Sequence, residues 1–230
     1  METNERGARR VTLVGQPELR AADVVVPRDF SSAAFPLVGA LLVPGSEITL
    51  PGIGLNPHRS GLLKTLLEMG AEIEQRNTRE VAGELVADLI VRASSLRGVT
   101  VPAERAPSMI DEYQILSVAA AFAVGETRMC GLSELRVKES DRFKSILEGL
   151  GSFGVEARET GDSITIEGCQ GSLAPRQPVT INTYGDHRIA MAFTVMGLTC
   201  GNPAIIDDMS MVATSYPRFR DDMAMLGATI

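Results

Sequence analysis

The sequence has 230 residues, 44% of them hydrophobic, so it can bury one large core or two small ones. Its formal net charge of -7 argues against a nucleic-acid partner, because such surfaces depend on many contacts from Lys and Arg to phosphate. The longest apolar runs are too short for a membrane span or a signal peptide, so we expect no membrane partner. The three cysteines, which show no metal-ligand spacing, favour packed thiols in a reducing, cytoplasmic compartment: Cys130, Cys169 and Cys200.

The predicted elements repeat along the chain. Three β-branched segments each precede an Ala-rich helical stretch; the segments are 23–27, 98–102 and 178–182, and the helical stretches are 31–42, 108–123 and 186–198. Each helix is followed by a second β-branched run, at 45–50, 125–129 and 201–206. A second helix then ends at a glycine, as a left-handed residue after a helix requires, at Gly70, Gly154 and Gly227. Further strands are predicted at 71–74, 88–92, 155–158, 163–167 and 228–230.

The repeating unit is therefore β-α-β-α-β-β, and it occurs three times, at about 23–97, 98–177 and 178–230. We expect an α/β fold in which these units form one globular domain. The third unit stops before its last strand, and a β-like segment at 11–14 belongs to no unit. Both features predict that the chain is the C-terminal part of something larger and that a strand from outside completes the last repeat.

Two polar motifs lie at corresponding junctions of these units. They are 136–142, with the sequence RVKESDR, and 186–191, with the sequence DHRIAM. Cations beside carboxylates are what a site needs to hold a phosphate and to move protons. A solvated charged turn would explain one such motif equally well, but two at corresponding junctions favour an active site.

Together with the segment 108–113, SMIDEY, these motifs resemble 5-enolpyruvylshikimate-3-phosphate synthase. Their residues are most similar to those of the bacterial class II branch of that family. The likeness extends through 30–37 and 213–217, and so covers essentially the whole chain in order. The resemblance implies a two-domain, inverse α/β barrel-like fold with three repeats in each domain. It implies that 1–28 is the end of the N-terminal domain and the crossover, and that 29–230 is the C-terminal catalytic domain.

The reaction that the resemblance implies moves the enolpyruvyl group of phosphoenolpyruvate to the 5-hydroxyl of shikimate 3-phosphate and releases phosphate. It implies no cofactor and no metal. In the family the other domain supplies further cations and hydroxyls to the same interdomain site. We therefore expect the N-terminal half to be the partner of this chain, and we expect the chain alone to be inactive.

The resemblance also implies roles for particular residues. Asp111 matches the acceptor of the hydroxyl proton, and Glu139 matches the proton donor to the methylene carbon. Lys138 matches a contact to shikimate 3-phosphate and is near enough in the sequence to tune Glu139. Arg142 and Arg188 match the pair that holds phosphoenolpyruvate, for which a planar fork is preferable to an ammonium group.

Each of these residues also has an ordinary structural explanation. Asp111 could cap a helix, and Lys138 with Glu139 could be a surface ion pair worth at most about 1 kcal/mol. An arginine in the first turn of a helix is disfavoured by the helix dipole, so an anion should compensate Arg142 and Arg188. For His187 three roles stay open, namely orienting the loop, polarising the phosphate or filling a niche, and we favour a supporting role.

Two positions depart from the family pattern. Thr214 stands where many members carry a Lys that contacts phosphoenolpyruvate, and Arg28 stands where a glycine is usual, which puts the local turn in doubt.

Two other functions compete with the enolpyruvyl transfer to shikimate 3-phosphate. One is a non-catalytic binding module of the same fold, and the other is an enolpyruvyl transferase acting on a UDP-sugar, which we would not expect to carry both motifs in this form.

Overall fold

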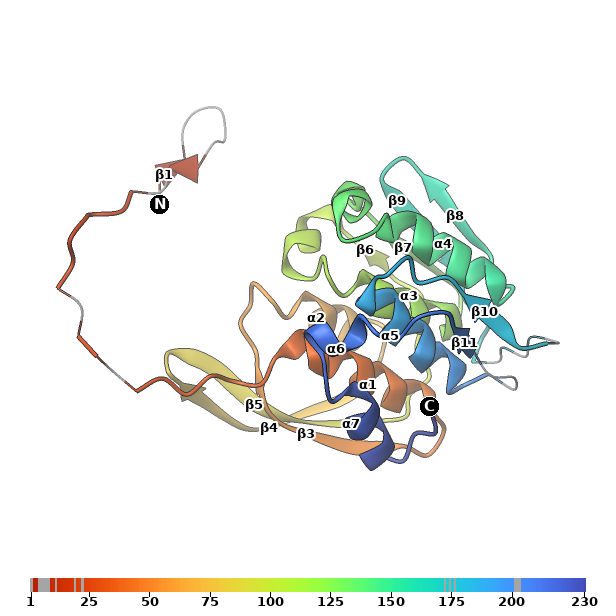
Figure 1. The fold of residues 1–230 in the computed structure, drawn as a ribbon, viewed down its shortest axis with the longest axis horizontal. Coiled ribbons are helices and arrows are strands. Elements are labelled where there is room, and N and C mark those ends of the chain that lie inside the picture. The colour runs from red at the N-terminus through yellow and green to blue at the C-terminus, as the bar shows by residue number, and fades with distance from the viewer. Residues whose placement is uncertain are drawn as a thin grey trace.

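Three central helices form the middle of the molecule (Figure 1): α1 (Phe30–Leu42), α3 (Tyr113–Phe122) and α5 (His187–Gly197). The computed structural model describes residues 2–3, 9–10, 12–18, 20–21, 23–171, 173, 175, 177–200 and 204–230. The central helices contact one another, and all ten residues of α3 are buried. Their Ala-, Leu- and Val-rich sequences are apolar on nearly every side, which is typical of a helix enclosed in a core.

Small sheets surround these helices. β3 (Glu47–Gly54), β4 (Glu72–Val81) and β5 (Glu84–Arg92) form an antiparallel sheet in the order β3-β5-β4. The second sheet has the order β6-β7-β9-β8 and contains β6 (Thr100–Val101), β7 (Glu126–Met129), β8 (Ala157–Thr160) and β9 (Ser163–Glu167). The third is a parallel pair, β10 (Val179–Ile181) with β11 (Ala204–Ile206). A separate short pair joins β1 (Glu2–Thr3) to β2 (Arg9–Arg10).

The strand order agrees with the predicted repeat. In the second unit β6 runs parallel to β7, and β9 and β8 follow with antiparallel pairing. The first unit has the same arrangement, with a single parallel bridge between Arg28 and Ile53 in place of the first strand pair. The third unit has the parallel pair, but in the described part of the chain no antiparallel strand follows β11. Its sheet therefore corresponds to only the first half of the other two.

Further helices lie outside the central three. They are α2 (Gly61–Glu68), α4 (Arg142–Ser152), α6 (Val212–Ser215) and α7 (Phe219–Met225), with 3-10 turns η1 (Ala103–Ser108) and η2 (Ser133–Val137). The glycines after α2, α4 and α7 have φ values of +90° at Gly70, +78° at Gly154 and +93° at Gly227, as predicted. Among the described helices, none has the length and apolar character needed to cross a membrane.

Some predicted elements are wrong. Segment 23–27 forms no strand, and Val24, Val25 and Val26 are 65–80% exposed because no described element packs against them. The helix predicted from residue 108 begins only at Tyr113, since the preceding chain turns through η1 and Met109 has a non-helical φ of -156°. Residues 228–230 and the described residues 12–14 are also not in strands, whereas Val11 and 201–203 lie outside the described residues.

The three cysteines fit the interpretation of packed thiols. Cys130, Cys169 and Cys200 are all partly buried, and no disulfide joins any of them. Burial raises the pKa of the Cys200 thiol to about 11, which keeps this group protonated and a poor nucleophile at neutral pH.

Candidate active site

The N-terminal ends of the central helices meet on one face of the molecule. Ser31 Oγ of α1 donates to Glu112 Oε1 at the start of α3 (2.6 Å), and Arg188 Nη1 of α5 donates to the Asp111 carbonyl (2.7 Å). At the other end of α1, a Cβ on Gly39 would lie within 4 Å of Val195, near the C-terminal end of α5. α1 and α5 therefore run in the same direction. Their partly positive N-terminal ends favour anions on the face where the two predicted motifs lie.

Arg142, the first residue of α4, is the centre of this site, and its side chain is 1% exposed. Nε donates to Asp186 Oδ2 (2.7 Å), and Nη1 donates to Asp111 Oδ1 (2.9 Å). Nη2 lies 2.5 Å from Glu139 Oε2. The helix dipole predicted a compensating anion for this arginine, and here three carboxylates of the chain provide it. One buried guanidinium thus brings together the two predicted proton-transfer residues, Asp111 and Glu139.

Asp186 was not among the predicted site residues, but the structure places it in the site. It caps α5, and its side chain is 0% exposed. It accepts hydrogen bonds from the Arg188 backbone N–H (2.9 Å), from Ser140 Oγ (3.1 Å) and from Arg142. Burial alone would raise the pKa of Asp186, but these bonds and the charge of Arg142 outweigh it, and the pKa is lowered. Its place before an α-helix signals a cap in the sequence. Its pairing with Arg142, 44 positions away, has no local signal.

Asp111 lies in the turn before α3 and is half-buried. Lys138 Nζ is 3.5 Å from Asp111 Oδ1, so the structure brings these two predicted site residues together. Burial would raise the pKa of Asp111, but the charges of Arg188, Lys138 and Arg142 together hold it below its ordinary value. The carboxylate is therefore ionised at neutral pH and able to accept a proton.

The predicted tuning of Glu139 by Lys138 is not seen among the described ion pairs. Lys138 Nζ lies 3.1 Å from Glu134 and 3.5 Å from Asp111, whereas Glu139 pairs with Arg142. Lys138 has an extended backbone, with φ -86° and ψ -156°, and successive side chains in extended chain point to opposite sides. The basic partner of Glu139 is thus Arg142, three residues later.

Arg188 and His187 occupy the first turn of α5. The Arg188 side chain is 14% exposed, and its Nη1 contacts the Asp111 carbonyl and, at 3.4 Å, Glu112 Oε1. His187 is partly buried, and burial together with the charge of Arg188 lowers its pKa. The neutral imidazole is therefore favoured at neutral pH, while the supporting role of His187 stays a prediction.

Three further residues at this site have no strong signal in the sequence. Glu112 is 2% exposed, and burial raises its pKa. Its partner Ser31 accepts a hydrogen bond from Arg59 Nη2 (2.8 Å), and Arg59 comes from the loop before α2. Glu112 could have been noticed as the neighbour of Asp111, but nothing in the sequence near Ser31 or Arg59 indicates this contact.

The two departures from the family pattern have different outcomes. Thr214 lies in α6, is exposed and donates its hydroxyl to the Met211 carbonyl (2.7 Å). Arg28 does not have a positive φ; its N–H donates to Gly52 O (3.1 Å) and its carbonyl accepts from Gly54 N (2.9 Å). The backbone at this position is thus extended, so a residue with a side chain is tolerated there and the doubt about the turn is removed.

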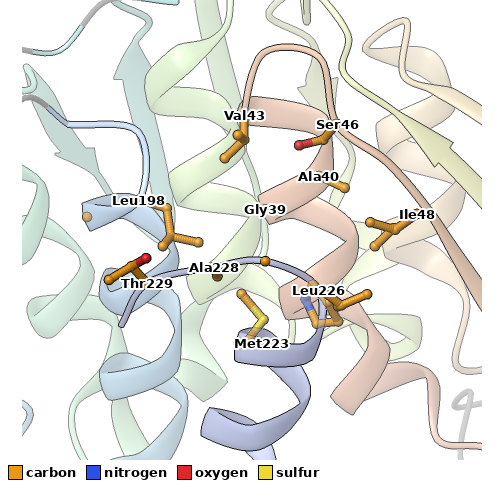
Figure 2. Close-up of a pocket in the computed structure, with 13 residues that line it drawn as sticks. Gly39, Ala40, Val43, Ser46, Ile48, Leu198, Met223, Leu226, Ala228 and Thr229 are labelled. Carbon is orange, nitrogen blue, oxygen red and sulfur yellow. The ribbon is translucent and has the colours of Figure 1, made fainter.

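A cavity of about 330 Å³ lies at the other end of the central helices, between the C-terminal ends of α1 and α5 and the residues after α7 (Figure 2). Figure 2 shows Val43, Leu198 and Met223 around it. None of its lining residues carries an ionisable side chain. This cavity therefore offers no group for proton transfer, and the charged cluster is the better candidate for an active site.

Comparison with known proteins agrees with the motifs. The family model described as EPSP synthase (3-phosphoshikimate 1-carboxyvinyltransferase) matches residues 2–223. Proteins named 3-phosphoshikimate 1-carboxyvinyltransferase from Methylorubrum populi and Paramagnetospirillum magneticum are 60% and 56% identical, over 96% and 100% of this chain. The chain spans about half the length of these relatives, 49% and 51% respectively.

Solved structures show the same fold. EPSP synthase from Acinetobacter baumannii matches with a TM-score of 0.89 and 39% identity, over 94% of this chain and 50% of that one. The enolpyruvyl transferase NikO from Streptomyces tendae matches with a TM-score of 0.68 over 90% of this chain and 44% of that one. At 18% identity, the second match shows only that the fold is shared.

Proposed function

Because the chain belongs to the EPSP synthase family, we propose that it is the C-terminal half of a 3-phosphoshikimate 1-carboxyvinyltransferase. The reaction joins the enolpyruvyl group of phosphoenolpyruvate to the 5-hydroxyl of shikimate 3-phosphate, in the shikimate pathway of aromatic amino acid biosynthesis, and releases phosphate. The observation that carries this proposal is the shared contact of Asp111 and Glu139 with the buried Arg142. It holds two carboxyl groups, one for each proton transfer, at two different nitrogens of one guanidinium group, Asp111 at Nη1 and Glu139 at Nη2.

In this proposal the two carboxylates have different tasks. Asp111, kept ionised by its cationic neighbours, takes the proton of the attacking hydroxyl. Glu139 is 55% exposed, so solvent can supply the proton that it gives to the methylene carbon, which gains one as the C–O bond forms. The tetrahedral adduct then loses phosphate. The steps need only proton transfer and charge stabilisation, so the proposal includes no metal and no other cofactor.

The cations hold the substrates. Lys138, 20% exposed and next to Asp111, contacts shikimate 3-phosphate, and Arg188 and Arg142 hold phosphoenolpyruvate. All three guanidinium nitrogens of Arg142 already face carboxylates. A substrate anion must therefore replace one of these contacts, and Glu139, which is the most exposed partner, is the one that we expect to yield.

The charge balance supports a partner. In the described site, Lys138, Arg142 and Arg188 are accompanied by an equal or greater negative charge from Asp111, Glu112, Glu139 and Asp186. Two polyanionic substrates need more positive charge than this cluster provides. We infer that the N-terminal half, either in trans or as the missing part of the chain, supplies it. The half-length match to the relatives and the single pairing of β11 in the described sheet support the same partner.

The alternatives are less well supported. A non-catalytic module of this fold has no need of two carboxylates on one buried arginine. A UDP-sugar as acceptor is not favoured by the names of the relatives, which specify 3-phosphoshikimate. We also propose a cytoplasmic location, since partly buried cysteines without metal-ligand spacing suit a reducing compartment.

The test is phosphate release from phosphoenolpyruvate and shikimate 3-phosphate, measured with the chain alone, with the N-terminal half alone and with both. We expect turnover only from the combination. D111N and E139Q should each lower turnover by about 10²–10⁴, the range for a lost general acid or base. The control is E148Q, at an exposed residue of α4 that pairs with Lys144 and Tyr184, and it should keep normal turnover. An inactive combination, or full activity of D111N and E139Q, would contradict the proposal.

A further inference from the structure

Glu112 is a buried carboxylate for which the proposed chemistry has no task. Its side chain is 2% exposed, and it is the residue that precedes α3. Oε1 accepts from Ser31 Oγ at 2.6 Å, within the range of a hydrogen bond to an ionised carboxylate. Ser31 Oγ is free to donate its proton in this direction because it accepts from Arg59 Nη2 (2.8 Å). Glu112 is therefore held in a fixed position by donors only.

The cation that Glu112 faces is Arg188, whose Nη1 lies 3.4 Å from Oε1. In the described part of the chain, the hydrogen bonds of the Arg188 side chain all use Nη1, to the Asp111 carbonyl and to Glu112. The edge formed by Nε and Nη2 is therefore left for a ligand, and such an edge matches the oxygens of a phosphate or carboxylate in pairs. Arg142 differs, since Nε, Nη1 and Nη2 all face carboxylates.

We propose that Glu112 is a positioning residue and counter-ion for Arg188, which turns one edge of the guanidinium toward the substrate anion and limits how tightly that anion is held. This inference rests on the proposed function of the site. Two effects of opposite sign act on the ligand. The contact with Glu112 orders the guanidinium and so favours binding, whereas the negative charge of Glu112 repels an anion on the other edge.

The net effect of Glu112 on anion affinity depends on which is larger, the ordering of the guanidinium or the repulsion of the anion. The Asp111 carbonyl still holds Nη1 at 2.7 Å when Glu112 is neutral, so only part of the ordering is lost. The repulsion acts across a single guanidinium in a partly buried site, where screening by solvent is weak. The repulsion is therefore the larger effect, and neutralising Glu112 should strengthen anion binding. For an enzyme that must release inorganic phosphate, a counter-ion of this kind speeds release.

The experiment compares E112Q with the control E148Q in the combination of this chain with the N-terminal half. Both variants remove one negative charge, but Glu148 is exposed on α4 and contacts Tyr184 (2.8 Å) and Lys144 (3.5 Å) instead of site residues. Calorimetry with inorganic phosphate and with phosphoenolpyruvate should give about tenfold tighter binding for E112Q, and no change for E148Q. The KM for phosphoenolpyruvate should fall without a rise in kcat, because tighter binding of the ground state does not speed the chemical step.

A purely structural role would give the opposite sign, with weaker binding in E112Q, and that result or an unchanged affinity would overturn the inference. The Arg188 Nε–H signal in NMR spectra, assigned with R188K, should shift in E112Q without any ligand. This signal and the phosphate affinity do not depend on turnover, so they test the inference even if the proposed reaction is wrong. If E112Q does not fold, E112D can replace it, because the shorter side chain draws the negative charge away from Nη1. Its phosphate affinity should rise by less than the tenfold expected for E112Q, and a fall in affinity would refute the role of Glu112.

Discussion

Substitution of Asp186 tests most directly what holds the candidate site together. Its carboxylate is fully buried and accepts from three donors, Arg142 Nε (2.7 Å), Ser140 Oγ (3.1 Å) and the Arg188 N–H (2.9 Å). D186N keeps the size of the side chain and a carbonyl oxygen to cap α5. It removes the negative charge and places an NH₂ group where Arg142 or Ser140 needs an acceptor.

The expected loss of stability follows from these contacts. Removing one partner of a buried ion pair costs about 3–5 kcal/mol in the free energy of unfolding. Arg142 keeps Asp111 (2.9 Å) and Glu139 (2.5 Å), so the lower end of this range, about 3 kcal/mol, applies to D186N. D186A also loses the helix cap and should cost about 1 kcal/mol more. For a chain of this length, about 3 kcal/mol corresponds to a fall in Tm of roughly 6–12 °C.

The assay is urea unfolding followed by circular dichroism, with the free energy obtained by linear extrapolation. The matched control is D141N. Asp141 also caps a helix, α4, by accepting from Lys144 N (3.0 Å), and it also lies near an arginine, Arg136 (3.6 Å), but its side chain is 39% exposed. We expect less than about 1 kcal/mol for D141N, since exposed ion pairs contribute little. If D186N and D141N lost similar amounts, the buried pair with Arg142 would not be the support that we infer.

Three further predictions follow from the charges and the sheet edges. Phosphoenolpyruvate should give little heat in calorimetry with the chain alone and clear heat once the N-terminal half is added, and tight binding by the chain alone would contradict the divided site. The lowered pKa values of Asp111 and Asp186 add stability that is full above about pH 4 and is lost as the pH falls through the folded-state pKa of each. Acid unfolding of D186N should therefore depend less steeply on pH below about pH 4 than that of the parent chain. Among the described strands β11 pairs only with β10, and Ile205 is 50% exposed, so we expect the chain to self-associate or to bind the N-terminal half through this edge. Light scattering at several concentrations tests this, and a monomer with protected β11 amides would refute it.

Local sequence patterns determined most of the fold. The Ala-rich stretches predicted the three central helices, because an apolar sequence on every side of a helix can be satisfied only by burial. The glycines at 70, 154 and 227 correctly predicted where three outer helices end, since only a residue without a Cβ readily adopts the left-handed conformation. Where burial depended on a partner strand, as at Val24 to Val26, the same β-branched pattern predicted a strand that does not form.

In the candidate site, too, the sequence predicted some features and only the tertiary structure decided the others. The motifs and the family resemblance predicted Asp111, Glu139, Arg142 and Arg188 as site residues, and the tertiary structure brings them into contact through Arg142 and the Asp111 carbonyl. Only that structure could decide the partners. Ser31 meets Glu112 across 81 positions, because α1 packs against α3 with their N-terminal ends together, and Arg142, at the start of the outer helix α4, meets Asp186 across 44 positions. Ion-pair partners depend on distance in space, and for contacts between separate helices a single sequence carries no local signal of that distance.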